Sequence, residues 1–517
     1  MVALCSHCGG FGPEDQLITC AAFEGGQCSP CRERAAIRDQ IKRLKATHDA
    51  IGTVMNAVHD PFIHKLPPEI GSRIFHLSLS TLTLEGRHGA HPDSHIWAWP
   101  LKLGSVCRKW RQLAWATPQL WTIVCVGIKY LTTRYIAESL PGLLREWLSR
   151  SGALPLTIYF HETWNRFGSR VDLDVKTRNA LEVATGSAID IINLHSGRWR
   201  FLHVTGSAGS IKRFASSTGH KQLISLELAG TLLLWPGANF ITESELNLTH
   251  LKLSRFSFTD MNVRWDKITH ATLSEVMLGK ALEFLRRASN LEYYCISLSK
   301  RRELHFLDPV VHPRLRSVDL WGPDFEILLS KITLPSLEEW TSTQDINDEH
   351  SLVPLAAMRS FFKRSRCRVK VLNLNSPILR SSDLDPLLQE LPSLERLHLY
   401  FWMTEPDEDP RMDDILIRIF DSDPEDRTPE GFLPHLRFME CKTGAPSLSW
   451  DLLPVIIGHG RRRLLTLKVF AGESDISNQT AFELLRLEDE GLGLDLQIID
   501  VSTGGDILDL FRIGMFD

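Results

Sequence analysis

Residues 391–399 read LPSLERLHL, and Leu394, Leu397 and Leu399 within this stretch follow the spacing L-x-x-L-x-L. The same spacing recurs between residues 199 and 501. The strongest copies begin at 223, 248, 315, 369, 394 and 464; weaker copies begin at 199, 268, 291, 436 and 496, and the one at 337 keeps only its first half. From 199 to 337 the starts are 20–25 residues apart. A short repeat of this kind predicts one structural unit per copy.

This period resembles that of leucine-rich repeats, in which each unit contributes one short parallel strand and a returning helix or irregular arm. Several copies share a proline lead-in, namely HPRL at 312, LPSL at 334 and 391, and LPHL at 433, and proline fits at a strand entrance. We therefore expect an α/β fold in which residues 150–517 form an irregular solenoid, with parallel strands on its concave face and helices or arms outside. The alternative is a doubly wound sheet, but the period is too short for βαβ units and no glycine-rich phosphate loop occurs.

An acidic stretch interrupts the repeats at residues 405–430, which carry eleven acidic and three basic side chains. A charge run of this kind is most often a solvated loop. The alternative hypothesis is a projecting acidic arm that holds a basic partner. The centre of the stretch, ILIRIF, is apolar, and we expect it to form a helix that anchors the insertion.

Two shorter stretches, KLPPEIGSRIFHLSLS at 65–80 and VCRKWRQLAWATPQLW at 106–121, predict a small helical region at residues 61–125. Pro67 or Pro68 suits a first helical turn, where the N–H groups lack intrahelical partners. Glu69 then lies where the helix dipole favours a carboxylate. We expect an irregular connection and a second helix with Val106 and Trp110 on one side. The pair has more apolar surface than it can bury alone, which predicts a partner for it.

These two stretches resemble an F-box, as found in a large group of fungal proteins. The positions that match the F-box pattern in order are Leu66, Pro67, Glu69, Ile70, Ile74, Phe75, Val106, Cys107, Arg108, Trp110, Arg111, Leu113, Ala114, Leu120 and Trp121. Gly71 departs from it, because a large residue is usual there, and glycine costs a helix about 1 kcal/mol relative to alanine.

The resemblance implies docking onto the Skp-type adaptor of a cullin–RING ubiquitin ligase, with an unknown target protein on the solenoid. The residues that it implies for the adaptor contact are Leu66, Pro67, Pro68, Glu69, Ile70, Ile74, Phe75, Val106, Cys107, Trp110, Leu113 and Trp121. Such a receptor is not an enzyme, since it brings target and ubiquitin-loaded enzyme together. The alternative is a repeat scaffold without a ligase role, in which the helical pair caps the solenoid.

Residues 1–31 are rich in cysteine and glycine, and Cys5-x-x-Cys8 and Cys28-x-x-Cys31 have the spacing of a structural zinc site. We expect these four cysteines as ligands, ahead of Cys20 or His7. The alternative is a leader whose cysteines bind nothing.

Residues 32–60 predict an amphipathic helix. Its apolar positions step by four and three residues, as in a heptad seam, and the seam consists of Ile37, Ile41, Leu44, His48, Ile51, Met55 and Val58. One interpretation is that this stripe packs on the neighbouring domain; the other is self-association.

The bulk composition excludes several function classes. A charge of −5 with a pI near 6.5 argues against a nucleic-acid binder, although a basic stretch at 32–45 beside the cysteines leaves a zinc-dependent one as a distant alternative. We see no secretory signal, no membrane-length apolar run and no disulfide framework, which predicts the cytoplasm or nucleus. Phosphate-loop, nucleophile-elbow and H-E-x-x-H motifs are all absent from the sequence.

Overall fold

The computed structural model describes residues 3–4, 11–12, 28–58, 66–80, 98–129, 132–163, 174–215, 220–230, 240–299, 307–322, 326–344, 353–378, 381–403, 412–422, 432–443, 448–460, 465–471, 476–490, 495–501 and 503–512. The chain divides into two compact units. The smaller unit consists of Met1–Cys125 and Leu143–Leu154, and the larger unit of Val126–Gly142 and Pro155–Asp517.

The smaller unit is largely helical. The two-residue strands β1 (Ala3–Leu4) and β2 (Phe11–Gly12) pair antiparallel. Among the described residues of this unit, the helices and the 3₁₀ turn that follow are α1 (Ser29–Val58), α3 (Pro68–Ser80), α5 (Trp99–Val106), α6 (Arg108–Trp115) and η1 (Pro118–Trp121). The division from the larger unit falls within strand β3 (Ile123–Ile128) and helix α7 (Arg134–Arg150).

Aromatic packing holds the helices of the smaller unit together. The rings of Phe75 on α3 and Trp110 on α6 lie 4.9 Å apart between centroids. The indole of Trp121 is fully buried and donates a hydrogen bond of 2.8 Å to the carbonyl of Ala114. The buried core consists of Phe75, Leu79, Leu103, Ala114, Leu120 and Trp121.

The backbone of Gly71 explains how α3 approaches α6. A Cβ atom at this position would lie 2.6 Å from Cδ2 of Leu113, which is closer than carbon atoms pack. The leucine of α6 therefore occupies the space that a larger residue on α3 would fill.

The second helix of this region is in fact two helices, so the prediction of one helix through Val106 and Trp110 was wrong. Cys107 separates α5 from α6 with an extended backbone, φ −156° and ψ 173°. Its sulfur accepts a hydrogen bond of 3.4 Å from the backbone N–H of Trp110, so Cys107 caps the start of α6.

The larger unit is built on a fourteen-stranded sheet that begins at β3 and follows the order of the sequence throughout. Its further strands are β4 (Leu156–Glu162), β5 (Trp199–Gly206), β6 (Ser225–Gly230), β7 (His250–Ser254), β8 (His270–Val276), β9 (Tyr293–Leu298), β11 (Ser317–Trp321), β13 (Glu339–Thr343), β14 (Val371–Ile378), β15 (Arg396–Met403), β16 (Phe438–Thr443), β17 (Thr466–Ala471) and β18 (Asp495–Asp500). From β4 to β18 neighbouring strands are parallel. A doubly wound sheet would reverse its strand order at one point, and this sheet does not.

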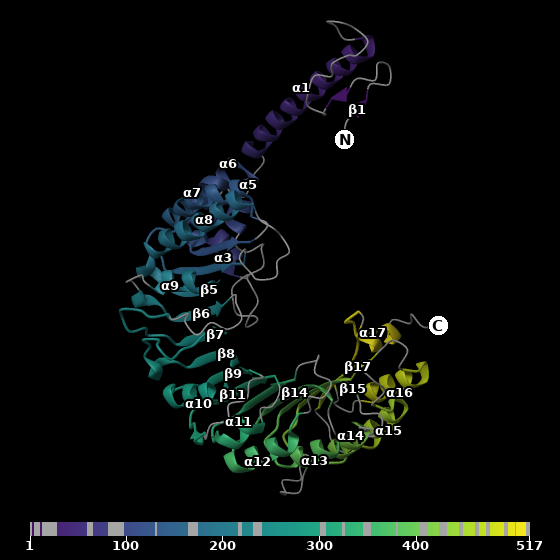
Figure 1. Cartoon of the computed structure of the whole chain (residues 1–517). Coiled ribbons are helices and arrows are strands. Elements are labelled where there is room, and N and C mark those ends of the chain that lie inside the picture. The colour runs from purple at the N-terminus through teal and green to yellow at the C-terminus, as the bar shows by residue number, and fades with distance from the viewer. Residues whose placement is uncertain are drawn as a thin grey trace. The chain divides into compact units, whose positions relative to one another are not determined.

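Helices connect many of these strands. They are α8 (Val175–Asn193), α9 (Ala208–Ala215), α10 (Leu278–Arg287), α11 (Glu326–Lys331), α12 (Leu355–Ser365), α13 (Ser381–Gln389), α14 (Met412–Asp421), α15 (Leu453–His459), α16 (Asn478–Asp489) and α17 (Ile507–Arg512). Short 3₁₀ turns replace them elsewhere, as at η4 (Trp265–Lys267) before β8, and β10 (Val310–Val311) pairs with β12 (Ile332–Thr333) in a separate small sheet. Within the larger unit the strands line the inner side of a curve and the helices its outer side, as in a solenoid (Figure 1).

The repeated apolar positions stack in register from strand to strand. Leu226 pairs with Leu251, and Leu372 with Leu397, and all four side chains are buried. Each pair joins the same position of the sequence repeat, so the period read from the sequence places the strands correctly from β5 to β17.

The copy at 496 was placed wrongly. Leu496 pairs with Leu467 and Ile498 with Val469, so Leu496 is the second apolar position of its unit, not the first. Val501, which the sequence pattern placed inside, is 53% exposed. Strands β3 and β4 come before the first sequence copy and extend the sheet by two strands that the pattern did not predict.

The acidic stretch at 405–430 contains α14, so its apolar centre does form a helix. Ile415, Leu416, Ile419 and Phe420 on this helix are buried. The carboxylate of Asp413 accepts a hydrogen bond of 3.0 Å from the backbone N–H of Ser449. Residues 405–411 and 423–430, on which the acidic-arm hypothesis depends, lie outside the described residues.

Candidate interaction sites

The start of α3 presents five of the twelve residues that the F-box resemblance assigns to an adaptor contact. The carbonyl of Pro67 accepts hydrogen bonds from the backbone N–H groups of Ile70 (3.0 Å) and Gly71 (3.1 Å), and Pro68 is the first helical residue. Pro67, Pro68 and Glu69 are exposed, Ile70 is 49% exposed, and Leu66 is half-buried. An apolar residue held out by a rigid first turn costs little entropy to immobilise on a partner.

The remaining predicted contact residues divide between surface and core. Val106 at the end of α5 is 51% exposed, while Ile74, Cys107, Trp110 and Leu113 are half-buried. Phe75 is 3% exposed and Trp121 is completely buried. We therefore place Phe75 and Trp121 among the residues that hold the helices together, and not on a contact surface.

Three further large apolar residues, which the predicted contact set does not include, lie on the surface of the smaller unit. Leu77 on α3, Leu101 on α5 and Trp115 on α6 are between 44% and 52% exposed. Trp115 lies under the guanidinium of Arg150, 4.4 Å from its ring centroid.

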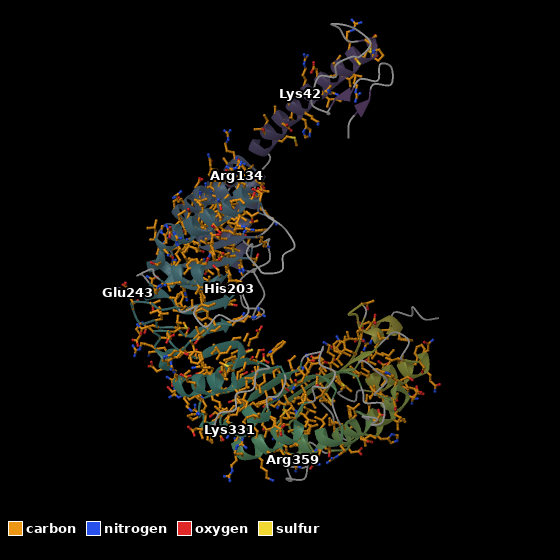
Figure 2. All side chains as sticks on the ribbon, viewed as in Figure 1. Lys42, Arg134, His203, Glu243, Lys331 and Arg359 are labelled. Carbon is orange, nitrogen blue, oxygen red and sulfur yellow. The ribbon has the colours of Figure 1, made fainter. Side chains whose placement is uncertain are left out.

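The strand side of the larger unit is polar, because alternate strand residues point away from the buried apolar positions. On β5, β6 and β7 the neighbouring residues His203, Glu227 and Lys252 form one charged cluster (His203 is labelled in Figure 2). Nδ1 of His203 lies 2.8 Å, and Nζ of Lys252 2.6 Å, from the carboxylate of Glu227.

The pKa of Glu227 is lowered to about 2. Burial alone would raise the pKa of this carboxyl group, but hydrogen bonds and charge from His203 and then Lys252 outweigh the cost of burial. Glu227 is therefore a fixed negative charge between two donors at any physiological pH.

The same arrangement recurs on β15, β16 and β17, near the other end of the sheet. Nδ1 of His398 lies 3.0 Å, and Nζ of Lys468 3.4 Å, from the carboxylate of Glu440. Beside the first cluster, on β7 and β8, the rings of His250 and His270 stack with centroids 4.5 Å apart. The strand side thus carries polar and aromatic groups that are held in place by contacts with one another.

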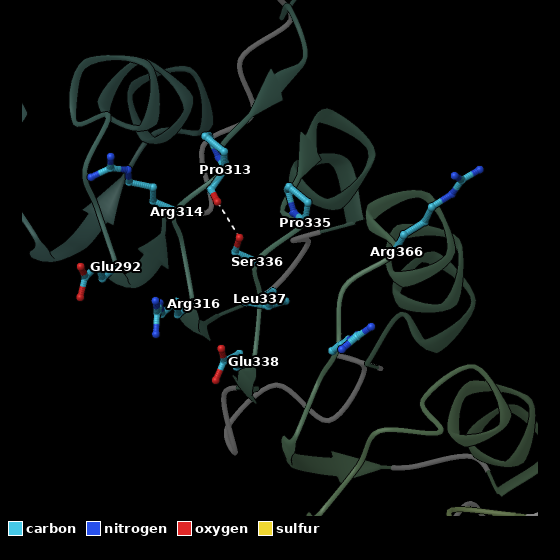
Figure 3. A pocket seen from close by; sticks show the side chains of 10 residues that line it. Glu292, Pro313, Arg314, Arg316, Pro335, Ser336, Leu337, Glu338 and Arg366 are labelled. Carbon is cyan, nitrogen blue, oxygen red and sulfur yellow. Dashed lines mark hydrogen bonds between the residues drawn. The ribbon is translucent and has the colours of Figure 1, made fainter. Parts of the chain in front are cut away.

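A groove of about 450 Å³ lies at the strand entrances of β11, β13 and β14 (Figure 3). Its floor includes Ser336, whose hydroxyl donates a hydrogen bond of 2.6 Å to the carbonyl of Pro313. Its charged lining residues are Glu292, Arg314, Arg316, Glu338, Arg366 and Arg368. Arg314 and Arg366 extend in opposite directions (Figure 3), so the arginines do not converge on one point, and we assign the groove no ligand of its own.

One acidic residue, Glu162 at the end of β4, is 2% exposed. Its carboxylate accepts hydrogen bonds from the hydroxyl (3.0 Å) and backbone N–H (3.2 Å) of Ser207, and from the hydroxyl of Ser210 (2.5 Å). These donors satisfy the buried charge and join β4 to the start of α9, which is a structural role.

Two of the four predicted zinc ligands, Cys28 and Cys31, are described by the structure. They are 3% and 4% exposed at the beginning of α1, whose later side chains are mostly exposed. Cys5 and Cys8 lie outside the described residues, as do Cys20 and His7. Within the described part of the chain no group of three or more metal-ligating side chains gathers, and no helix there has the length and hydropathy to cross a membrane.

No protein-family model matches this chain, and a search of curated proteins finds no match either.

Proposed function

We propose that this protein is a substrate-recognition subunit of an SCF-type cullin–RING ubiquitin ligase. In this proposal the helices of the smaller unit dock as an F-box on a Skp-type adaptor, and the solenoid of leucine-rich repeats binds the target protein. The chain itself performs no chemistry; it raises the local concentration of the target's lysines near the ubiquitin-loaded enzyme. We expect it to act in the cytoplasm or the nucleus.

The observation that carries the proposal is how the F-box-like positions divide between inside and outside. Phe75, Ala114 and Trp121 build the core of the smaller unit. Pro67 and Ile70 lie on its surface, where their apolar side chains contribute no stabilisation through burial. Exposed apolar residues on a rigid helix start are typical of a docking surface.

The strand side of the larger unit supports the second half of the proposal. The clusters around Glu227 and Glu440 hold charged groups in fixed positions, and the stacked histidines add flat surface. Preorganised charges of this kind select a partner by electrostatic complementarity more than they raise its affinity.

Co-purification with a Skp-type adaptor tests the proposal. We expect a stoichiometric complex with the wild-type chain and none with Leu66→Ala/Pro67→Ala. The matched control is Leu143→Ala, which removes an apolar side chain that is 63% exposed on α7 and should leave adaptor binding unchanged. Circular dichroism of each variant shows whether it is folded. If the folded wild-type chain does not bind the adaptor, the ligase role is wrong and a repeat scaffold remains.

We also propose that Cys28 and Cys31, with Cys5 and Cys8, hold a structural zinc ion. Burial of both thiols at the start of an otherwise exposed helix fits metal ligands, since a helix N-terminus stabilises thiolates. In the sequence Cys5 and Cys8 fall between the paired strands β1 and β2. Zinc content of the purified protein tests this: we expect one equivalent in the wild type, loss in Cys28→Ser, and no change in the control Cys367→Ser, which alters a half-buried cysteine of the larger unit. A zinc-free wild-type protein would contradict the site.

A further inference from the structure

Helix α1 carries an apolar stripe that is exposed on the surface of the smaller unit. Along this stripe Ile37, Ile41, Leu44, Ile51 and Met55 are between 48% and 61% exposed. The first interpretation drawn from the sequence, that the stripe packs on the neighbouring domain, therefore finds no support in the described residues. Five exposed apolar side chains along one face of this 30-residue helix are typical of a surface that binds a partner.

The spacing of the stripe indicates that its partner is another helix. Steps of four and three residues are the spacing that stays on one seam when a helix winds around another helix at 3.5 residues per turn. In this register Ile41, His48 and Met55 are a positions, and Ile37, Leu44 and Ile51 are d positions. A stripe that packed on a globular surface would not need such a strict repeat, because an isolated helix has 3.6 residues per turn.

The flanking charges favour a second copy of the same helix in parallel orientation. In a parallel pair each g position faces the e position five residues later on the other helix. Glu33 is a g position and Arg38 an e position, so the pair brings Glu33 of each copy to Arg38 of the other. The next such pair joins Gln40 to Lys45, which adds no repulsion. An antiparallel pair would instead set e positions against e positions, where Arg38 and Lys45 are both cationic.

His48, the polar residue within the stripe, would set the register of such a pair. His48 is an a position, and its side chain is 89% exposed in the single chain. In a parallel, in-register pair the two His48 rings meet each other. A single polar a position fixes the register of a two-stranded coiled coil at a cost in stability.

We propose that α1 forms a parallel, in-register, two-stranded coiled coil with α1 of a second copy of this chain. The proposal goes beyond the proposed function and does not depend on it. If both hold, each dimer carries two adaptor-binding units and two solenoids, and a target with two sites would bind with raised effective concentration.

Sedimentation of the full chain over a wide range of concentrations tests the proposal. We expect a monomer–dimer equilibrium for the wild type. Leu44→Glu should raise the dissociation constant at least tenfold, because it places two carboxylates in the seam. The matched control Ala46→Glu introduces the same charge two residues away on the opposite face, at a position that is exposed, and should keep the wild-type constant. A wild type that stays monomeric, or a dimer that Leu44→Glu leaves intact, would overturn the proposal.

A charge exchange tests the orientation. Glu33→Arg and Arg38→Glu should each weaken the dimer several-fold, because each sets like charges against one another, and the double variant should restore it. If the double variant stays as weak as the single ones, the parallel register is wrong.

His48→Ile should tighten the dimer, since it completes the apolar seam. An unchanged or weaker dimer would show that His48 does not lie in the interface.

Discussion

The repeated leucines of the larger unit and the F-box-like residues of the smaller unit differ in how far they are buried. In the larger unit the repeated leucines face the helices and the strand side is left to polar groups such as His203 and Glu227. In the smaller unit a compact core around Trp121 coexists with exposed apolar residues at Pro67, Ile70 and Val106. We infer that the repeats of the larger unit bury these leucines by stacking on one another, whereas the exposed residues of the smaller unit are available for a partner, as the proposed function requires.

The largest expected effect lies in the core of the larger unit. Trp340 on β13 is completely buried against Phe361 and Phe362, with ring centroids 5.3 and 5.4 Å away. Trp340→Ala should lower the free energy of unfolding by about 3–5 kcal/mol, because it removes packing and leaves a cavity. Denaturant unfolding measures this. The control is Trp321→Ala, at a tryptophan that is 48% exposed one strand away, and it should lower the free energy of unfolding far less. Equal losses would contradict the assignment of Trp340 as buried and Trp321 as exposed.

The next effect is a pH dependence of the larger unit. The pKa of Glu227 is lowered to about 2 in the folded chain and returns to its ordinary value when the chain unfolds. Its contribution, on the order of 2 kcal/mol, is therefore complete above the unfolded pKa near 4.3 and is lost as the pH falls through that window toward 2. Unfolding curves between neutral and acid pH check this, with Glu227→Gln as the comparison. If both chains lose stability in parallel, the charged cluster contributes nothing.

A smaller effect is expected at the contact between α3 and α6 in the smaller unit. Gly71→Leu restores the residue type usual in the F-box pattern, yet it forces a side chain into the space of Leu113. We expect a loss of about 1–3 kcal/mol in unfolding free energy from overpacking. Compensation by Leu113→Ala in the double variant should recover part of the loss. A stabilised Gly71→Leu chain would mean that α3 and α6 are farther apart than the structure has them.

The smallest effect concerns α1, where Gly52 has no neighbouring atom within 4 Å of an added Cβ. Gly52→Ala should stabilise the helix by about 0.5–1 kcal/mol, because alanine has the higher helix propensity and meets no clash. Helical circular dichroism of the full chain on heating measures it. A destabilised variant would show that a neighbour occupies the space beside Gly52.

The larger unit was more predictable from the sequence than the smaller one. A parallel ladder repeats the same environment on every strand, so the spacing Leu394–Leu397–Leu399 is enough to set the register. The pattern failed at residues 496–501, where Leu496 and Ile498 lack the leading leucine of a repeat and the adjacent Ile498 and Ile499 compete for one buried position. It also missed β3 and β4, where the position of the leading leucine, three residues before the first buried strand residue, holds Trp121 and Ala153.

The smaller unit depends on contacts that no local pattern encodes. The break at Cys107 comes from one extended residue in a segment that otherwise reads as a continuous helix. Phe75 and Trp121 were grouped with the contact residues because a sequence motif does not separate what holds a surface in place from the surface itself. The closeness of Gly71 to Leu113 joins residues 42 positions apart and could only come from the structure.

Adaptor binding by the folded chain tests the central claim most directly. The account predicts a stoichiometric complex with a Skp-type adaptor that Leu66→Ala/Pro67→Ala abolishes and Leu143→Ala preserves. It is contradicted if the folded wild-type chain and the adaptor elute separately, or if the double variant binds as well as the wild type, because the exposed apolar start of α3 would then serve another purpose.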